Sequence, residues 1–158
     1  MFSTTSIVQV IELMLAPGLM ISACGLLLLG MNNKYSLVVN RIRLLNEERR
    51  RVLVKGSTGN FSYEENVRLE SISLQLDKLT MRARLVRNAV LSYTNAVAFF
   101  VITSLLIGIQ YFAAINLNIL ITAVFLLGML SVLAGVLFAA YETREGYKII
   151  QLEVKIDE

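Results

Sequence analysis

Three apolar runs without a charged residue stand out along the chain. They cover residues 13–31, 89–114 and 119–141. A helix needs about 20 mostly apolar residues to cross a bilayer, so each run is long enough to do so. The pattern predicts an all-α integral membrane protein with three transmembrane helices. Residues 1–11 contain no Lys or Arg, which is not typical of a signal peptide, so we expect the first run to stay in place as an anchor.

The segment between the first two runs predicts a long antiparallel helical hairpin resembling a coiled coil. Its first arm, residues 32–54, carries one apolar stripe at helical spacing, formed by Tyr35, Val38, Ile42, Leu45 and Val52. Two glycines within residues 55–60 predict a turn. Ser62 and Glu65 then form a capping box, and Glu64 is spaced to pair with Arg68 on the same helix.

The second arm has the clearest periodicity in the chain. Apolar residues follow steps of three and four from the hairpin into the second run, which indicates one helix from about residue 63 to residue 112. This seam is expected to pack against residues 32–54, either within one chain or in part between subunits. Its members are Leu69, Ile72, Leu76, Leu79, Ala83, Val86, Val90, Tyr93, Val97 and Phe100.

Basic residues are distributed very unevenly, and this predicts an orientation. Residues 32–88 hold 12 of the 15 Lys and Arg side chains against six acidic ones, a net charge of +6, and the other three follow residue 141. Lys and Arg near membrane spans stay on the cytoplasmic side. We therefore expect residues 1–31 to form the first span with its N-terminus outside and residues 32–88 a cytoplasmic hairpin. Residues 89–141 then hold the second and third spans, and residues 142–158 a cytoplasmic tail, for which a helix is favoured.

Two groups of basic residues differ in their expected partners. Four lie close enough to the predicted membrane surface to contact anionic lipid: Lys34, Arg82, Arg84 and Arg87. Arg49, Arg50 and Arg51 would lie about 25 Å deeper in the cytoplasm, beyond a Debye length. We expect these three arginines either to stabilise the C-terminal end of their helix through their positive charge or to dock an acidic protein partner. No aromatic residues accompany them in a binding motif, so nucleic acid is not indicated.

A few polar or irregular positions in the spans are candidates for a pathway or a hinge. Pro17 lacks an amide hydrogen, so a kink is predicted beside Gly18, either structural or lining a cavity. Glu12 is placed at the outer interface, and it becomes an ion-binding candidate if the helix sits deeper. Asn95 is expected to hydrogen-bond between helices or, as the alternative, to bind a solute.

Small residues at four-residue spacing predict a packing face on the third span. Ser131, Gly135 and Ala139 form this stripe, and small residues let helix backbones approach closely. The spacing leaves open whether the contact lies within one chain or between subunits.

Composition argues against catalysis. Apolar residues make up 56% of the chain and charged residues 17%, against about 25% charged in soluble domains. The chain has no His and one Cys, and it contains no phosphate-binding loop or nucleophile motif, so we expect neither an enzyme nor a cofactor or metal. The first hypothesis is a structural or regulatory membrane protein that forms homo-oligomers and docks partners through its hairpin. The second is an oligomeric ion channel or small-solute pathway.

The order of these motifs resembles a bacterial membrane family known as domain of unknown function 2721. The resemblance rests on Leu15-Ala-Pro in the first run, on Arg41-Ile-Arg after it, and on the Arg-rich approach at residues 82–88. It extends over nearly the whole chain and implies a bacterial inner membrane location. It implies no activity, because the family has none assigned.

Overall fold

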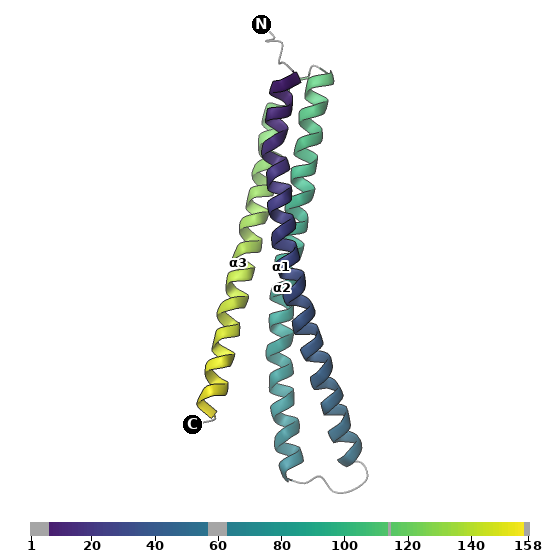
Figure 1. Ribbon diagram of the computed structural model, residues 1–158, viewed down its shortest axis with the longest axis vertical. Helices are drawn as coiled ribbons and strands as arrows, with labels where there is room; N and C mark the ends of the chain where they lie inside the picture. The colour runs from purple at the N-terminus through teal and green to yellow at the C-terminus, as the bar shows by residue number, and fades with distance from the viewer. Residues whose placement is uncertain (1–6, 57–62, 114, 157–158) are drawn as a thin grey trace. The chain divides into compact units, whose positions relative to one another are not determined.

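Three α-helices make up the described chain. The structure is a computed structural model that describes residues 7–56, 63–113 and 115–156. The helices are α1 (Ile7–Gly56), α2 (Tyr63–Ala113) and α3 (Asn118–Ile156), and their colour runs from purple to yellow along the chain in Figure 1. These ranges contain no strand, and each helix is long and apolar enough to cross a membrane. The predicted all-α class with three membrane-crossing helices is therefore confirmed.

The helices extend well beyond the apolar runs. The helix α1 continues through Pro17 and on to Gly56, and α3 extends to Ile156. The side chain of Gln110 bridges the end of α2 and the start of α3. Its amide donates to the side-chain oxygen of Asn118 at 2.8 Å and accepts from the backbone amide of Leu117 at 3.0 Å. The expected capping residue Ser62 lies outside the described residues.

Tertiary contacts divide the chain into two compact units. The first, called here the apolar unit, comprises Met1–Met31 and Asn88–Ala139. The second, the polar unit, comprises Asn32–Arg87 and Ala140–Glu158. Each unit contains a part of all three helices.

The core of the apolar unit is built from side chains of all three helices. Cys24 of α1 and Ala96 and Phe100 of α2 are buried together. The ring of Phe100 meets that of Phe125 on α3 with centroids 5.5 Å apart. Cys24 thus serves as a small apolar side chain.

Two glycines of α3 set how closely it approaches α2. A Cβ atom on Gly135 would lie 2.6 Å from Cε1 of Tyr93, and one on Gly128 would lie 2.8 Å from Cε1 of Phe100. Both aromatic side chains are fully buried. The absence of a side chain at these two positions therefore lets the rings lie directly on the backbone of α3.

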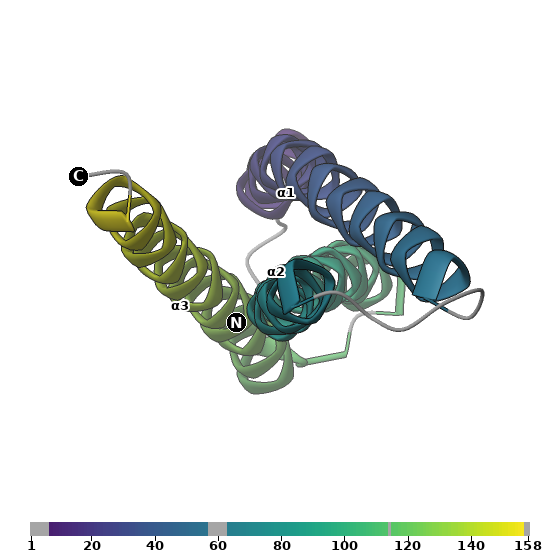
Figure 2. The same ribbon diagram turned by 90° about the horizontal axis from the view of Figure 1, so that it is seen from below.

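In the polar unit, the segments of α1 and α2 run antiparallel beside each other. Both segments carry buried aliphatic side chains, Val38 and Leu45 on α1 and Ile72 and Val86 on α2. Figure 2 views the helices end-on. All ten seam residues predicted on α2 are buried or half-buried by the described chain itself.

An ion pair links the two arms of the polar unit. The guanidinium of Arg68 donates to Oε1 of Glu48 at 2.6 and 2.9 Å. The expected pairing of Arg68 with Glu64 is wrong, because the antiparallel arm brings a carboxylate directly opposite Arg68.

Substituting Gly135 should expose this packing constraint. We expect Gly135→Ala to reduce the free energy of unfolding by about 1–3 kcal/mol, because the added methyl group meets a ring that cannot move aside. Unfolding in mixed micelles measures the change. Gly25→Ala is the matched control, since a Cβ there has nothing within 4 Å, and it should instead stabilise the protein by about 0.5–1 kcal/mol through helix propensity. Equal effects of the two substitutions would contradict the packing argument.

Candidate functional site

A single carboxylate joins all three helices within the polar unit. Glu142 of α3 accepts a hydrogen bond from Nζ of Lys34 on α1 at 3.1 Å. Its other oxygen accepts from Nη2 and Nε of Arg82 on α2, at 2.7 and 3.2 Å. The side chain of Glu142 is only 1% exposed, whereas those of Lys34 and Arg82 are 47% and 27% exposed. We call these three residues the Glu142 cluster.

The cluster forms where each helix leaves its apolar run. Lys34 is the first charged residue after residue 31, and Glu142 is the first after residue 141. Arg82 precedes the second run by seven residues. Gly146, one turn beyond Glu142, leaves room for the guanidinium, because a Cβ there would lie 3.2 Å from Nη2 of Arg82. The sequence therefore provides opposite charges at one level of the three helices.

The two cations keep Glu142 ionised. Glu142 lies just outside the apolar run at residues 119–141. Burial alone would raise the pKa of its carboxyl group, but hydrogen bonds from Arg82 and Lys34, together with their positive charges, hold that pKa below its ordinary value. Since the pKa is lowered, the ion pairs are present at neutral pH. Chemically, the cluster is a clamp between helices.

The structure separates the four predicted lipid contacts into two kinds. Lys34 and Arg82 are bonded to Glu142, although Lys34 keeps about half of its side chain exposed. Arg84 is exposed and pairs with no acidic residue in the described part of the chain. Arg87 is also exposed, but it has an interaction partner in that part of the chain. Sequence reasoning missed Glu142 as the partner. The signal was present, since this acid directly follows the third apolar run.

The four predicted pathway or hinge residues are not brought together. Pro17 is buried and Gly18 half-buried, while Glu12 and Asn95 are exposed. Met14 lines a groove with residues 104–113 of α2, so Glu12 lies at that end of the apolar unit. Asn95 lies nine residues before Ser104, about 14 Å along the helix at 1.5 Å per residue.

The side-chain amide of Asn95 has no hydrogen-bond partner in the described ranges of the chain. The side chain is exposed. The expected bond between helices therefore does not form inside one subunit; a bond to another subunit stays a prediction.

The predicted small-residue stripe of α3 has a mixed environment. Gly135 is buried against Tyr93, while Ser131 and Ala139 are half-buried. The hydroxyl of Ser131 donates to the carbonyl of Leu127 on its own helix at 2.9 Å. Of the three stripe residues, Gly135 makes a close approach to α2.

The groove beside Met14 is shallow and apolar. It has a volume of about 370 Å³ and is lined by α1 and α2. Its one hydroxyl belongs to Ser104 and donates to the carbonyl of Phe100. In the described part of the chain, no three His, Cys, Asp or Glu side chains are grouped so that they could hold a metal ion.

Three long apolar helices that pack directly on one another define a multi-pass helical membrane protein. The model of the family described as protein of unknown function DUF2721 matches residues 14–152, and the chain belongs to this family. The resemblance stated from the sequence is thus confirmed. Among curated proteins and solved structures, none matches the chain.

Neutralising Glu142 should loosen the three helices. We expect Glu142→Gln to lower the free energy of unfolding by about 1–3 kcal/mol, because a buried acceptor for two cations loses its charge. The partial exposure of Lys34 and Arg82 limits the loss, since water reaches both. Unfolding in mixed micelles at neutral pH provides the measurement.

Glu48→Gln is the matched control for this substitution. It neutralises the exposed pair with Arg68, which should contribute less than about 1 kcal/mol. If Glu48→Gln lowered the free energy of unfolding as much as Glu142→Gln, the proposed role of Glu142 in holding the helices together would be wrong.

Proposed function

We propose that the chain is a structural or regulatory protein of the bacterial inner membrane. In this proposal it self-assembles through its apolar unit and docks an acidic protein partner on its polar unit. The observation that carries the proposal is a set of exposed basic side chains on the polar unit without an acidic partner in the described chain. The members are Arg41, Arg43, Arg49, Arg50, Arg51, Lys78 and Arg84.

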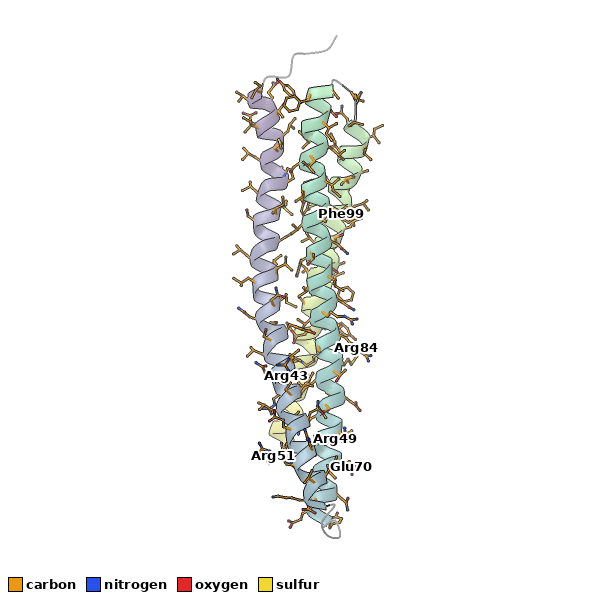
Figure 3. The ribbon with its side chains drawn as sticks, turned by 90° about the vertical axis from the view of Figure 1, so that its right-hand side faces the viewer. Arg43, Arg49, Arg51, Glu70, Arg84 and Phe99 are labelled. Atoms are coloured by element: carbon orange, nitrogen blue, oxygen red, sulfur yellow. The ribbon has the colours of Figure 1, made fainter. Side chains whose placement is uncertain are left out.

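The strongest part of this basic surface lies near the end of α1. Arg49, Arg50 and Arg51 are adjacent and exposed, five to seven residues before the helix ends at Gly56. Figure 3 shows Arg43, Arg49 and Arg51 along α1, with Glu70 on the neighbouring segment of α2. Arginine forms bidentate hydrogen bonds with carboxylates, so a cluster of arginines fits an acidic segment of a protein. The distance from the apolar run makes lipid headgroups a poor alternative for these three.

Charge also supports an orientation. The proposal places the polar unit in the cytoplasm and the start of α1 outside, because Lys and Arg near spans remain on the cytoplasmic side. Arg84 and Arg87 then lie beside the anionic headgroups of the inner leaflet, where each basic residue contributes about 1 kcal/mol.

A channel or solute pathway receives less support from the same residues. Glu12 and Asn95 lie apart, Pro17 is buried in the packing, and the groove beside Met14 is apolar. A pathway would have to be assembled from several subunits, because three helices from one chain cannot surround a pore.

The orientation is testable with single cysteines. Lys55→Cys and Asn118→Cys place thiols at exposed positions, one in the last turn of α1 and one at the start of α3. A membrane-impermeant maleimide should label Asn118→Cys on spheroplasts, and Lys55→Cys only after lysis. The unsubstituted chain is the control, since its Cys24 is buried. The reverse labelling pattern would show that the proposed orientation is wrong.

The docking function is testable in cells. A photoreactive amino acid in place of Arg50 should form discrete adducts with a protein partner, and Arg49→Glu combined with Arg51→Glu should abolish them, since like charges repel an acidic partner. The same photoreactive residue at exposed Leu126 in the third apolar run is the control and should yield no such adducts.

Native mass and conductance distinguish this function from the alternative. The purified protein in lipid nanodiscs should contain fewer than four subunits and should not conduct ions in a planar bilayer. A conducting ring of four or more subunits without adducts at Arg50 would favour the channel.

A further inference from the structure

We propose that the outward face of α2 in the apolar unit pairs with the same face of a second copy, forming a parallel homodimer around Asn95. This rests on the self-assembly proposed above and adds the surface, the partner and the subunit number. The surface, called here the Asn95 stripe, consists of Leu91, Asn95, Ala98, Ile102, Leu105, Ile109 and Phe112, and all seven are exposed.

Asn95 is the first reason to expect a protein partner. It lies six residues inside the second apolar run, about 9 Å along the helix. Lipid tails cannot bond its amide, and the described chain provides no partner. An amide both donates and accepts hydrogen bonds. Two copies of Asn95 facing each other across a two-fold axis can therefore satisfy each other.

The spacing of the stripe is the second reason. Its members follow alternating steps of four and three, which is a heptad repeat on the side of α2 away from buried Ala96 and Phe100. In this register Asn95, Ile102 and Ile109 occupy one core position of the heptad, and Leu91, Ala98, Leu105 and Phe112 occupy the other. Ile at the first position with Leu at the second favours two parallel strands, and one Asn at the first fixes the register.

The groove beside Met14 adds a third observation, because it is continuous with the stripe. Leu105, Ile109 and Phe112 belong to both, and Gly108 in the groove has open space where a side chain would be. A bulky side chain from a second copy can enter this space. Two copies inserted into the membrane in the same orientation bring these grooves to the same depth.

The same register also predicts where the pairing ends. Continued toward the start of α2, it places Arg84, Asp77 and Glu70 at the second core position, and all three are exposed. In a parallel dimer each of these residues would face the same residue of the second copy, and like charges directly opposite each other are unfavourable. The paired surface therefore lies within the membrane, between Leu91 and Phe112.

Association in detergent micelles tests the role of the amide. Loss of the hydrogen bonds in Asn95→Leu should weaken dimerisation about 3- to 30-fold, measured by sedimentation equilibrium. Asn95→Gln should retain most of the affinity. Thr94→Val is the matched control, because the hydroxyl of this exposed neighbour already bonds to the carbonyl of Val90 on its own helix. An Asn95→Leu protein that dimerises as well as the unsubstituted chain, or better, would overturn the proposal.

Disulfide formation in native membranes tests the geometry. Ile102→Cys should form a disulfide-linked dimer on mild oxidation, because facing core positions of a parallel pair come within reach of a disulfide. Leu133→Cys, on an exposed face of α3, should not. Linkage at Leu133 instead of Ile102 while the native mass stays dimeric would refute the stripe and leave self-assembly standing. A monomeric native mass would refute self-assembly itself.

Discussion

Lipid offers no hydrogen bonds, so each polar group within a membrane span must find its partner in protein. The backbone meets this constraint by forming α-helices in the described residues of the three apolar runs. Hydroxyl groups in the spans meet it by bonding the preceding turn, as Thr103 does with the carbonyl of Phe99. Charged side chains stay out of the runs, and the first acid after the third run is held by two cations. Asn95 is the amide in these runs for which the described chain provides no partner.

Close packing replaces the hydrophobic effect inside the membrane, because lipid is as apolar as the helices themselves. The aromatic rings of Tyr93 and Phe100 therefore lie on the backbone of α3 at Gly135 and Gly128, where no side chain keeps the helices apart. The polar unit can use water-driven burial, and its core is a row of aliphatic side chains such as Leu45 and Ile72. One chain thus combines two kinds of helix packing.

Periodicity predicted the helices well, since it is a property of local sequence. The runs and the seam indicated three long helices, and α2 begins and ends within one residue of the expected bounds. Partners between helices were harder to predict, because they depend on the rotation and register of one helix against another. The sequence placed Glu64 within reach of Arg68, but antiparallel packing brought Glu48 to it. Glu142 was missed as a partner for the same reason, being 108 residues from Lys34.

The continuity of α2 has a mechanical consequence. One unbroken helix of 51 residues, about 75 Å long, contributes to both units. The hydrogen bonds of an α-helix resist unwinding, so torque applied at one end turns the other end as well. Torque applied to the segment of α2 at residues 63–87 therefore turns the segment at residues 88–113, which carries the Asn95 stripe. The stiffness of one helix thus couples the two units mechanically.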